Sequence, residues 1–432
     1  MSELMFERMF ERMFERADKV CNLFKETYNA NYLSKYPDIK NIFFDVRDLY
    51  EKKYKKFPKA NKTFMSLVYN LANPEKQPVV DYITGPGIIS KWESTKYNKV
   101  IYLFGENDHS NKTGCIQSKI NLQGKKHMKI EQYLMDLFKH SPVFIDFYVE
   151  LDLFLDKSPL EVAENHGNTL NDILYQMKGC FGPLIKRKCP YNVRMHSIDV
   201  RYIESDKFKK SKLEEMFTFF HKWKSITSTE YMTTIYNWKT DKRWIQHWRN
   251  QFKDQINIMS KVKNNDDIVE IIFYQISNNN IINKELNRSI IPKQKIVDIY
   301  KILLDIELKR ETRVNARDIG LWFKRFKTIN LTLNKNYKFW DDDLHNIFLV
   351  LTIINAVSVD IYTTARIFKI FNVKEKEHYP KEPHNIIYYA GDGHTIPMSY
   401  FLQNLGFIRT EHSDNKVFSC ASMKGITQPL FS

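Results

Sequence analysis

Two histidines, His109 and His394, occupy the same local context in this sequence. Each follows a short apolar run and a glycine turn: Lys99–Phe104 with Gly105 precedes the first, and Asn385–Ala390 precedes the second. An imidazole that a carboxylate orients can take a proton from water and so begin hydrolysis. The repeated context therefore predicts one site that contains both histidines.

Carboxylates at the ends of the apolar runs supply the partners that such a site needs. They are Glu106, Asp108, Glu150 and Asp392. Histidines and carboxylates together can also bind a divalent metal that acidifies water. The sequence leaves both chemistries open: an imidazole acting directly as the base, or a divalent metal as cofactor. The metal ligands would then be Glu106, His109, Glu150 and His394.

Three further polar residues are expected to shape the pocket around these groups. Asp199 and Arg201 belong to a third apolar run, Val193–Tyr202, and Arg366 lies within Asp360–Phe368. An arginine near the reacting atoms can stabilise an oxyanion. Arg366 equally fits a helix that is tied to the core, and the sequence does not separate these two roles.

The elements that must position these residues are short buried strands alternating with helices. Continuous apolar runs, including Val143–Val149, are typical of strands buried on both faces, and the spacing in residues 128–140 predicts a helix. In open α/β sheets, ligands bind where the carboxyl ends of strands meet. The pattern predicts an α/β fold: a central, mainly parallel or mixed sheet flanked by helices, with a large helical insertion.

The chain is expected to fall into four segments. Residues 1–75 read as an N-terminal helical segment that begins with three Met-Phe-Glu-Arg repeats, and 76–205 form the first part of the core. Residues 206–340 are a lysine-rich, mainly helical insertion with a loop at Ser277–Asn287, and 341–432 complete the core. The last helix is predicted to end at Gly406. Its expected apolar face is Tyr400, Phe401, Leu402 and Leu405.

Composition bounds the class of protein. The 432 residues carry a net charge of +15 and are 43% hydrophobic, which excludes a wholly disordered chain. The charge allows acidic proteins or nucleic acid as partners, although a lysine-coated surface explains it equally. Five scattered cysteines without a Cys-x-x-Cys motif predict neither a disulfide framework nor structural zinc. With no apolar run long enough for a transmembrane segment, a cytoplasmic protein is expected.

Several of these motifs resemble one superfamily. Leu103–Ser110 resembles the strand-Gly-Glu-x-x-His motif of the erythromycin-esterase-like group, which is related to the ChaN haem-binding lipoproteins and the TraB/Tiki proteins. Tyr389–His394 and the later Leu-Gly-Phe are similar to the closing Gly-x-x-His element. Phe147–Glu150 and Met195–Arg201 look like the second and third strands. The Gly105-x-x-x-His109 spacing fits the esterase branch and is one residue longer than the Tiki pattern.

The resemblance implies a hydrolase with an unknown substrate. His109 would be the principal water-activating base, Glu106 and Glu150 its orienting or metal-binding carboxylates, and His394 the second imidazole. The Lys/Asn/Ile-rich composition resembles that of uncharacterised proteins of large DNA viruses. This resemblance implies that the protein is located in the host cytoplasm or in the virion. The alternative is a catalytically inactive viral structural or interaction protein on the same scaffold, with a basic surface that binds acidic partners or nucleic acid.

Overall fold

The structure is a computed structural model, and the chain divides into two compact units: residues 1–198 with 367–432, and residues 199–366. The described residues are 70, 77–106, 114–117, 122–150, 169–177, 190, 192–198, 257, 259–312, 320–321, 323–324, 327–328, 356–372, 380–414 and 419–431. The predicted N-terminal helical segment, the Met-Phe-Glu-Arg repeats and most of the predicted insertion lie outside them.

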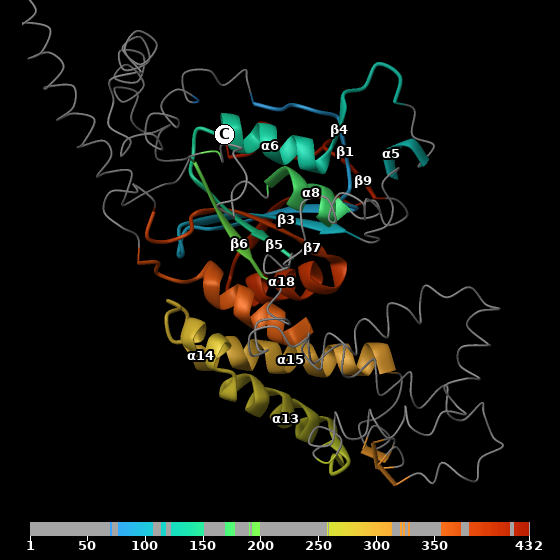
Figure 1. Ribbon diagram of the computed structural model, residues 1–432, viewed down its shortest axis with the longest axis vertical. Coiled ribbons are helices and arrows are strands. Elements are labelled where there is room, and N and C mark those ends of the chain that lie inside the picture. Colours follow the sequence, from blue (N-terminus) through green and yellow to red (C-terminus); the bar gives the residue numbers. More distant parts are fainter. Residues whose placement is uncertain are drawn as a thin grey trace, which may run out of the picture. The chain divides into compact units, whose positions relative to one another are not determined.

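A six-stranded mixed sheet forms the centre of the first unit, in the order β6-β5-β7-β3-β2-β8 (Figure 1). The strands are β2 (Ile88–Ser94), β3 (Lys99–Glu106), β5 (Ile145–Val149), β6 (Val193–Ser197), β7 (Asn385–Gly391) and β8 (Ile408–Asp414). Strands β6, β5, β7 and β3 are parallel, whereas β2 pairs antiparallel with both β3 and β8. The predicted α/β class is confirmed.

The apolar runs explain the three central strands. Every residue of β3, β5 and β7 is buried, because helices cover both faces of the sheet there. The sequence pattern did not predict strands at β2 and β8. Most of β8 is exposed, and its polar sequence becomes a strand because β2 offers it an edge to pair with.

Helices α6 (Ile130–His140) and α8 (Thr169–Met177) pack on one face, and α18 (Asp392–Asn404) on the other (Figure 1). The helix predicted at 128–140 is confirmed as α6. The helix after β7 is also confirmed, and Gly406 follows it with a φ of +86°. Tyr400 was wrongly placed on its apolar face, since 47% of that residue is exposed.

A second sheet has the strand order β4-β1-β9. A disulfide joins its strand β9 to a short helix. The strands of this sheet are β1 (Tyr82–Thr84), β4 (His127–Lys129) and β9 (Cys420–Ser422). Cys115, in α5 (Gly114–Gln117), is bonded to Cys420, with their Cα atoms 4.7 Å apart. The expectation that the cysteines form no disulfide is therefore wrong. The two partners are 305 positions apart, so local spacing carried no sign of the pairing.

The described part of the second unit is mainly helical and includes α13 (Asn265–Asn278), α14 (Asn280–Leu286), α15 (Lys293–Thr312) and residues 356–366. The loop predicted at Ser277–Asn287 is wrong, because most of that stretch is helical. Asn279 ends the preceding helix and caps α14, its side chain accepting from the amides of Ile281 and Ile282. Within the described part of the chain, no helix is long and apolar enough to span a bilayer.

Candidate functional site

Three parallel strands of the large sheet end side by side. β7 lies between β5 and β3, and its register places Gly391 opposite Glu106 at the end of β3. Glu150 directly follows β5, and its amide donates to the carbonyl of Tyr389 at 3.1 Å. The carboxyl edge of β5, β7 and β3 therefore holds two of the predicted carboxylates.

The Glu150 carboxylate binds His394. The distance from Nε2 of His394 to Oε1 of Glu150 is 3.1 Å, and the Gly391 amide donates to Oε2 at 3.0 Å. Gly391 is the N-cap residue of α18, so His394 lies in the first turn of that helix. Both side chains are less than 10% exposed. A carboxylate here also interacts favourably with the positive end of the helix.

Glu106 has a different partner. It is buried and accepts a hydrogen bond of 2.9 Å from the hydroxyl of Tyr389, a core residue of β7. Complete burial, and next the charge of Glu106, raise the pKa of Tyr389 well above its ordinary value. Tyr389 therefore stays protonated and remains a donor to Glu106.

Gly105 explains how α18 approaches the end of β3. A Cβ atom placed on Gly105 would lie 2.4 Å from Oδ1 of Asp392 and 2.7 Å from Oγ1 of Thr395, far inside contact distance. A side chain at this position would therefore force Asp392 and Thr395, in and just after the first turn of α18, to shift. This contact places Asp392, a predicted pocket residue, beside the residue that precedes Glu106.

The described donors do not form a metal site. Within the ranges that the structure describes, no three His, Cys, Asp or Glu side chains are grouped so that they would hold a metal ion. Glu150 and His394 bind each other, and Glu106 accepts from Tyr389. His109, the fourth predicted metal ligand, lies outside these ranges. The contact of Glu150 with His394 suits proton transfer between a carboxylate-oriented imidazole and water.

The remaining predicted residues are distributed as follows. Asp108, His109, Asp199 and Arg201 lie outside the described residues. Arg366 lies in the second unit, where Nη1 donates to the hydroxyl of Tyr362 at 3.2 Å and is 3.7 Å from Glu285. Sequence reasoning missed Tyr389, although its position two residues before Gly391 places it on the same sheet face as the Glu106 side chain.

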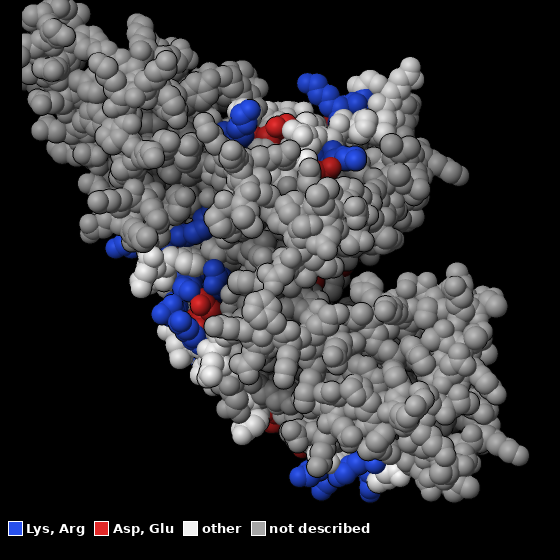
Figure 2. All heavy atoms as spheres, viewed as in Figure 1, with Lys and Arg blue, Asp and Glu red and all other residues white. Residues whose placement is uncertain are grey.

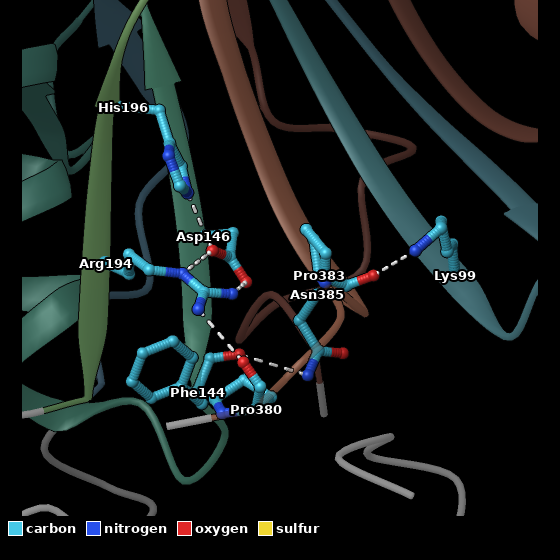
Figure 3. Close-up of polar contacts among 8 residues, drawn as sticks. All are labelled: Lys99, Phe144, Asp146, Arg194, His196, Pro380, Pro383 and Asn385. Carbon is cyan, nitrogen blue, oxygen red and sulfur yellow. Dashed lines mark hydrogen bonds and ion pairs between the residues drawn. The ribbon is translucent and has the colours of Figure 1, made fainter. Parts of the chain in front are cut away.

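A second polar cluster lies at the amino ends of the same strands (Figure 3). Asp146 of β5 is wholly buried and binds two residues of β6: Arg194, through Nε at 2.6 Å and Nη2 at 3.2 Å, and His196, through Nε2 at 2.8 Å. Burial alone would raise the pKa of Asp146, but the Arg194 charge and the His196 hydrogen bond together lower it to about 2.

The donors around this cluster bind the segment that leads into β7. Arg194 donates to the carbonyl of Pro380 at 2.9 Å, and its guanidinium lies 4.2 Å from the ring of Phe371. Lys99 is buried and donates to the carbonyl of Pro383, and burial lowers its pKa to about 8. These contacts anchor the chain before β7, and we assign the cluster a structural role.

Comparisons with protein-family models, with curated proteins and with solved structures found no match to this chain.

Proposed function

We propose that this protein is a hydrolase in which His394, oriented by Glu150, activates water. The observation that carries the proposal is the buried Glu150–His394 contact at the carboxyl edge of parallel strands. Glu150 lies against Nε2 of His394 and orients the ring, and the imidazole takes the proton from water. The carboxylate also stabilises the imidazolium that results.

The neighbouring groups have supporting roles in this proposal. Asp392 borders the site from the first turn of α18. Gly105 faces that helix, so the side chain of Glu106 points to the opposite face of the sheet, where Tyr389 binds it, and we assign Glu106 no part in the proton transfer. The positive end of α18 favours negative charge developing on a substrate oxygen. The resemblance to the erythromycin-esterase-like group implies the reverse assignment, with His109 as the principal base and His394 as the second imidazole. We assign the base to His394 because of its contact with Glu150, and we propose His109 as the second imidazole. Asp108 remains a proposed pocket residue, whereas Arg366 binds Tyr362 and lies near Glu285 within the second unit.

The alternative function, a basic interaction protein, requires a continuous basic surface. On the face that Figure 2 shows, the Lys and Arg side chains of the described residues form separate groups, several beside Asp or Glu. Counter-ion release on nucleic acid requires many cations along one path. The described residues on this face do not form such a path.

The test is turnover of a panel of p-nitrophenyl esters and anilides by purified full-length protein. Replacing a general base costs roughly 10²–10⁴-fold in rate, so we expect losses of that size for His394→Ala and Glu150→Gln. His412→Ala is the matched control, because His412 is exposed on β8. Circular dichroism establishes that each variant is folded. Equal turnover by His394→Ala and the wild type would exclude His394 as the base.

A further inference from the structure

The Cys115–Cys420 bond lies close to the proposed site through the backbone. Both cysteines are wholly buried, one in α5 and one in β9. The residues that precede them meet as well, since a Cβ placed on Gly114 would lie 2.0 Å from the carbonyl oxygen of Ser419. The bond thus joins two backbones that are in direct contact.

The turn at residues 84–87 connects this contact to the large sheet. The carbonyl of Ser419 accepts from the amide of Gly85 at 2.9 Å, and Gly85 has a φ of +127° that favours glycine. Two residues later, the amide of Gly87 donates to the carbonyl of Gly105 at 2.8 Å. The turn therefore bridges β9 and the end of β3.

Gly105 is the residue that packs against Asp392 and Thr395 of α18, and Glu106 follows it. Hydrogen bonds run from Ser419, which precedes β9, through the turn to this position. Through these bonds a change in the position of β9 would reach the end of β3.

We infer that Cys115 and Cys420 form a redox-sensitive brace that holds the carboxyl end of β3 in place. The consequence for activity rests on the proposed function. A dithiol reductant attacks the bond through its thiolate, passes through a mixed disulfide, and leaves two protein thiols and an oxidised, cyclic reductant. Oxidised glutathione restores the bond and releases two molecules of the reduced tripeptide. Because both sulfurs are buried, each step requires local opening.

The first measurement locates the bond. Full-length protein is equilibrated with oxidised glutathione or with dithiothreitol, denatured in the presence of N-ethylmaleimide, and digested for mass spectrometry. We expect Cys115 and Cys420 to be labelled only after reduction. Label on both residues in the oxidised sample would overturn the inference.

The second measurement tests, without any substrate, whether the bond stabilises the turn and β3. Hydrogen exchange of the amides of Gly85, Gly87 and residues 99–106 is compared between the oxidised and reduced proteins. We expect exchange to be about tenfold faster after reduction, with β5 changing less. The double variant Cys115→Ser/Cys420→Ser should match the reduced wild type in both redox states, and Cys189→Ser should behave as the wild type. Unchanged exchange at both segments would refute the brace.

Ester turnover, measured in the same samples, separates the two proposals. Lower turnover together with faster exchange supports both. Faster exchange in a protein that turns over no substrate in either state supports the brace and counts against the hydrolase. Turnover that is equal in both states, despite faster exchange, would overturn the claim that the brace regulates the site.

Discussion

The buried carboxylates of the first unit differ in the donor that each one binds. Asp146 binds Arg194, whose guanidinium does not release a proton near neutral pH, in addition to His196. Glu150 binds His394, and imidazole is the side chain that most often acts as a general acid or base. The arginine fixes Asp146 as a permanent anion in a structural cluster. Glu150 and its histidine form a pair in which a proton can move.

Asp146→Asn is expected to destabilise the fold by roughly 3 kcal/mol, because it leaves the partly buried Arg194 without its counter-ion. The depressed pKa of Asp146, about 2 against 3.8, stabilises the native state above pH 4. That contribution of about 2 kcal/mol is lost as the pH falls from 4 to 2. Urea unfolding at pH 7 and along the acid limb measures both effects.

Asp414→Asn, at an exposed position of β8, is the control for this experiment. It should change neither the stability at pH 7 nor the acid limb. If Asp146→Asn were as stable as the control variant at pH 7, Asp146 would not be the counter-ion of Arg194.

At the scale of elements, the packing of α18 on β3 decides the geometry of the proposed site. The helix starts immediately after β7, and its first turn carries His394 and also covers Gly105. The Gly391 amide is bound by Glu150 from the neighbouring strand, so three elements meet at one helix terminus. A displacement of the helix would therefore alter the contact of His394 with Glu150.

Gly105→Ala should destabilise the protein by about 1–3 kcal/mol, since its Cβ would overlap Asp392 and Thr395. Gly393→Ala is the matched control. A Cβ there meets no atom within 4 Å, and alanine favours the helix by up to about 1 kcal/mol, so equal or higher stability is expected. Thermal unfolding of the two variants measures the difference. Equal stability of both would show that α18 does not need the glycine.

For the whole molecule, the free energy of unfolding changes with pH wherever the unfolded and native states bind different numbers of protons. Burial lowers the pKa of Lys99 from 10.5 to about 8, so the unfolded chain binds more protons between these values and stability rises with pH there. Buried Tyr102, Tyr133 and Tyr389 have the opposite effect at higher pH. Burial raises the pKa of each, so their stabilising contribution is lost above pH 10.

Lys99→Met is therefore expected to remove the rise in stability between pH 8 and 9.5, a window in which the tyrosines are still protonated. Denaturant unfolding of the variant and the wild type across this window measures the slope. A wild-type slope that persists in Lys99→Met would mean that another group is responsible.

The local pattern predicted much of the first unit, for reasons that lie within a few residues. Continuous apolar runs located β3, β5 and β7, and the spacing of Ile130, Tyr133 and Leu134 located α6. β8 could not be predicted, because its strand conformation depends on pairing with β2. α14 was missed because asparagines usually favour turns, although Asn279 serves as a cap.

The sequence by itself determined which segments are buried and where polar residues follow them, because burial and turn geometry depend on near neighbours. It also determined that Glu106, Glu150 and His394 occupy strand ends or the helix start that follows. Tertiary structure alone decided their partners. Glu150 meets an amide 241 positions away, and Cys115 meets a cysteine 305 positions away. Such pairings follow from strand order and from helix packing across the sheet, which are settled only when the whole core is buried.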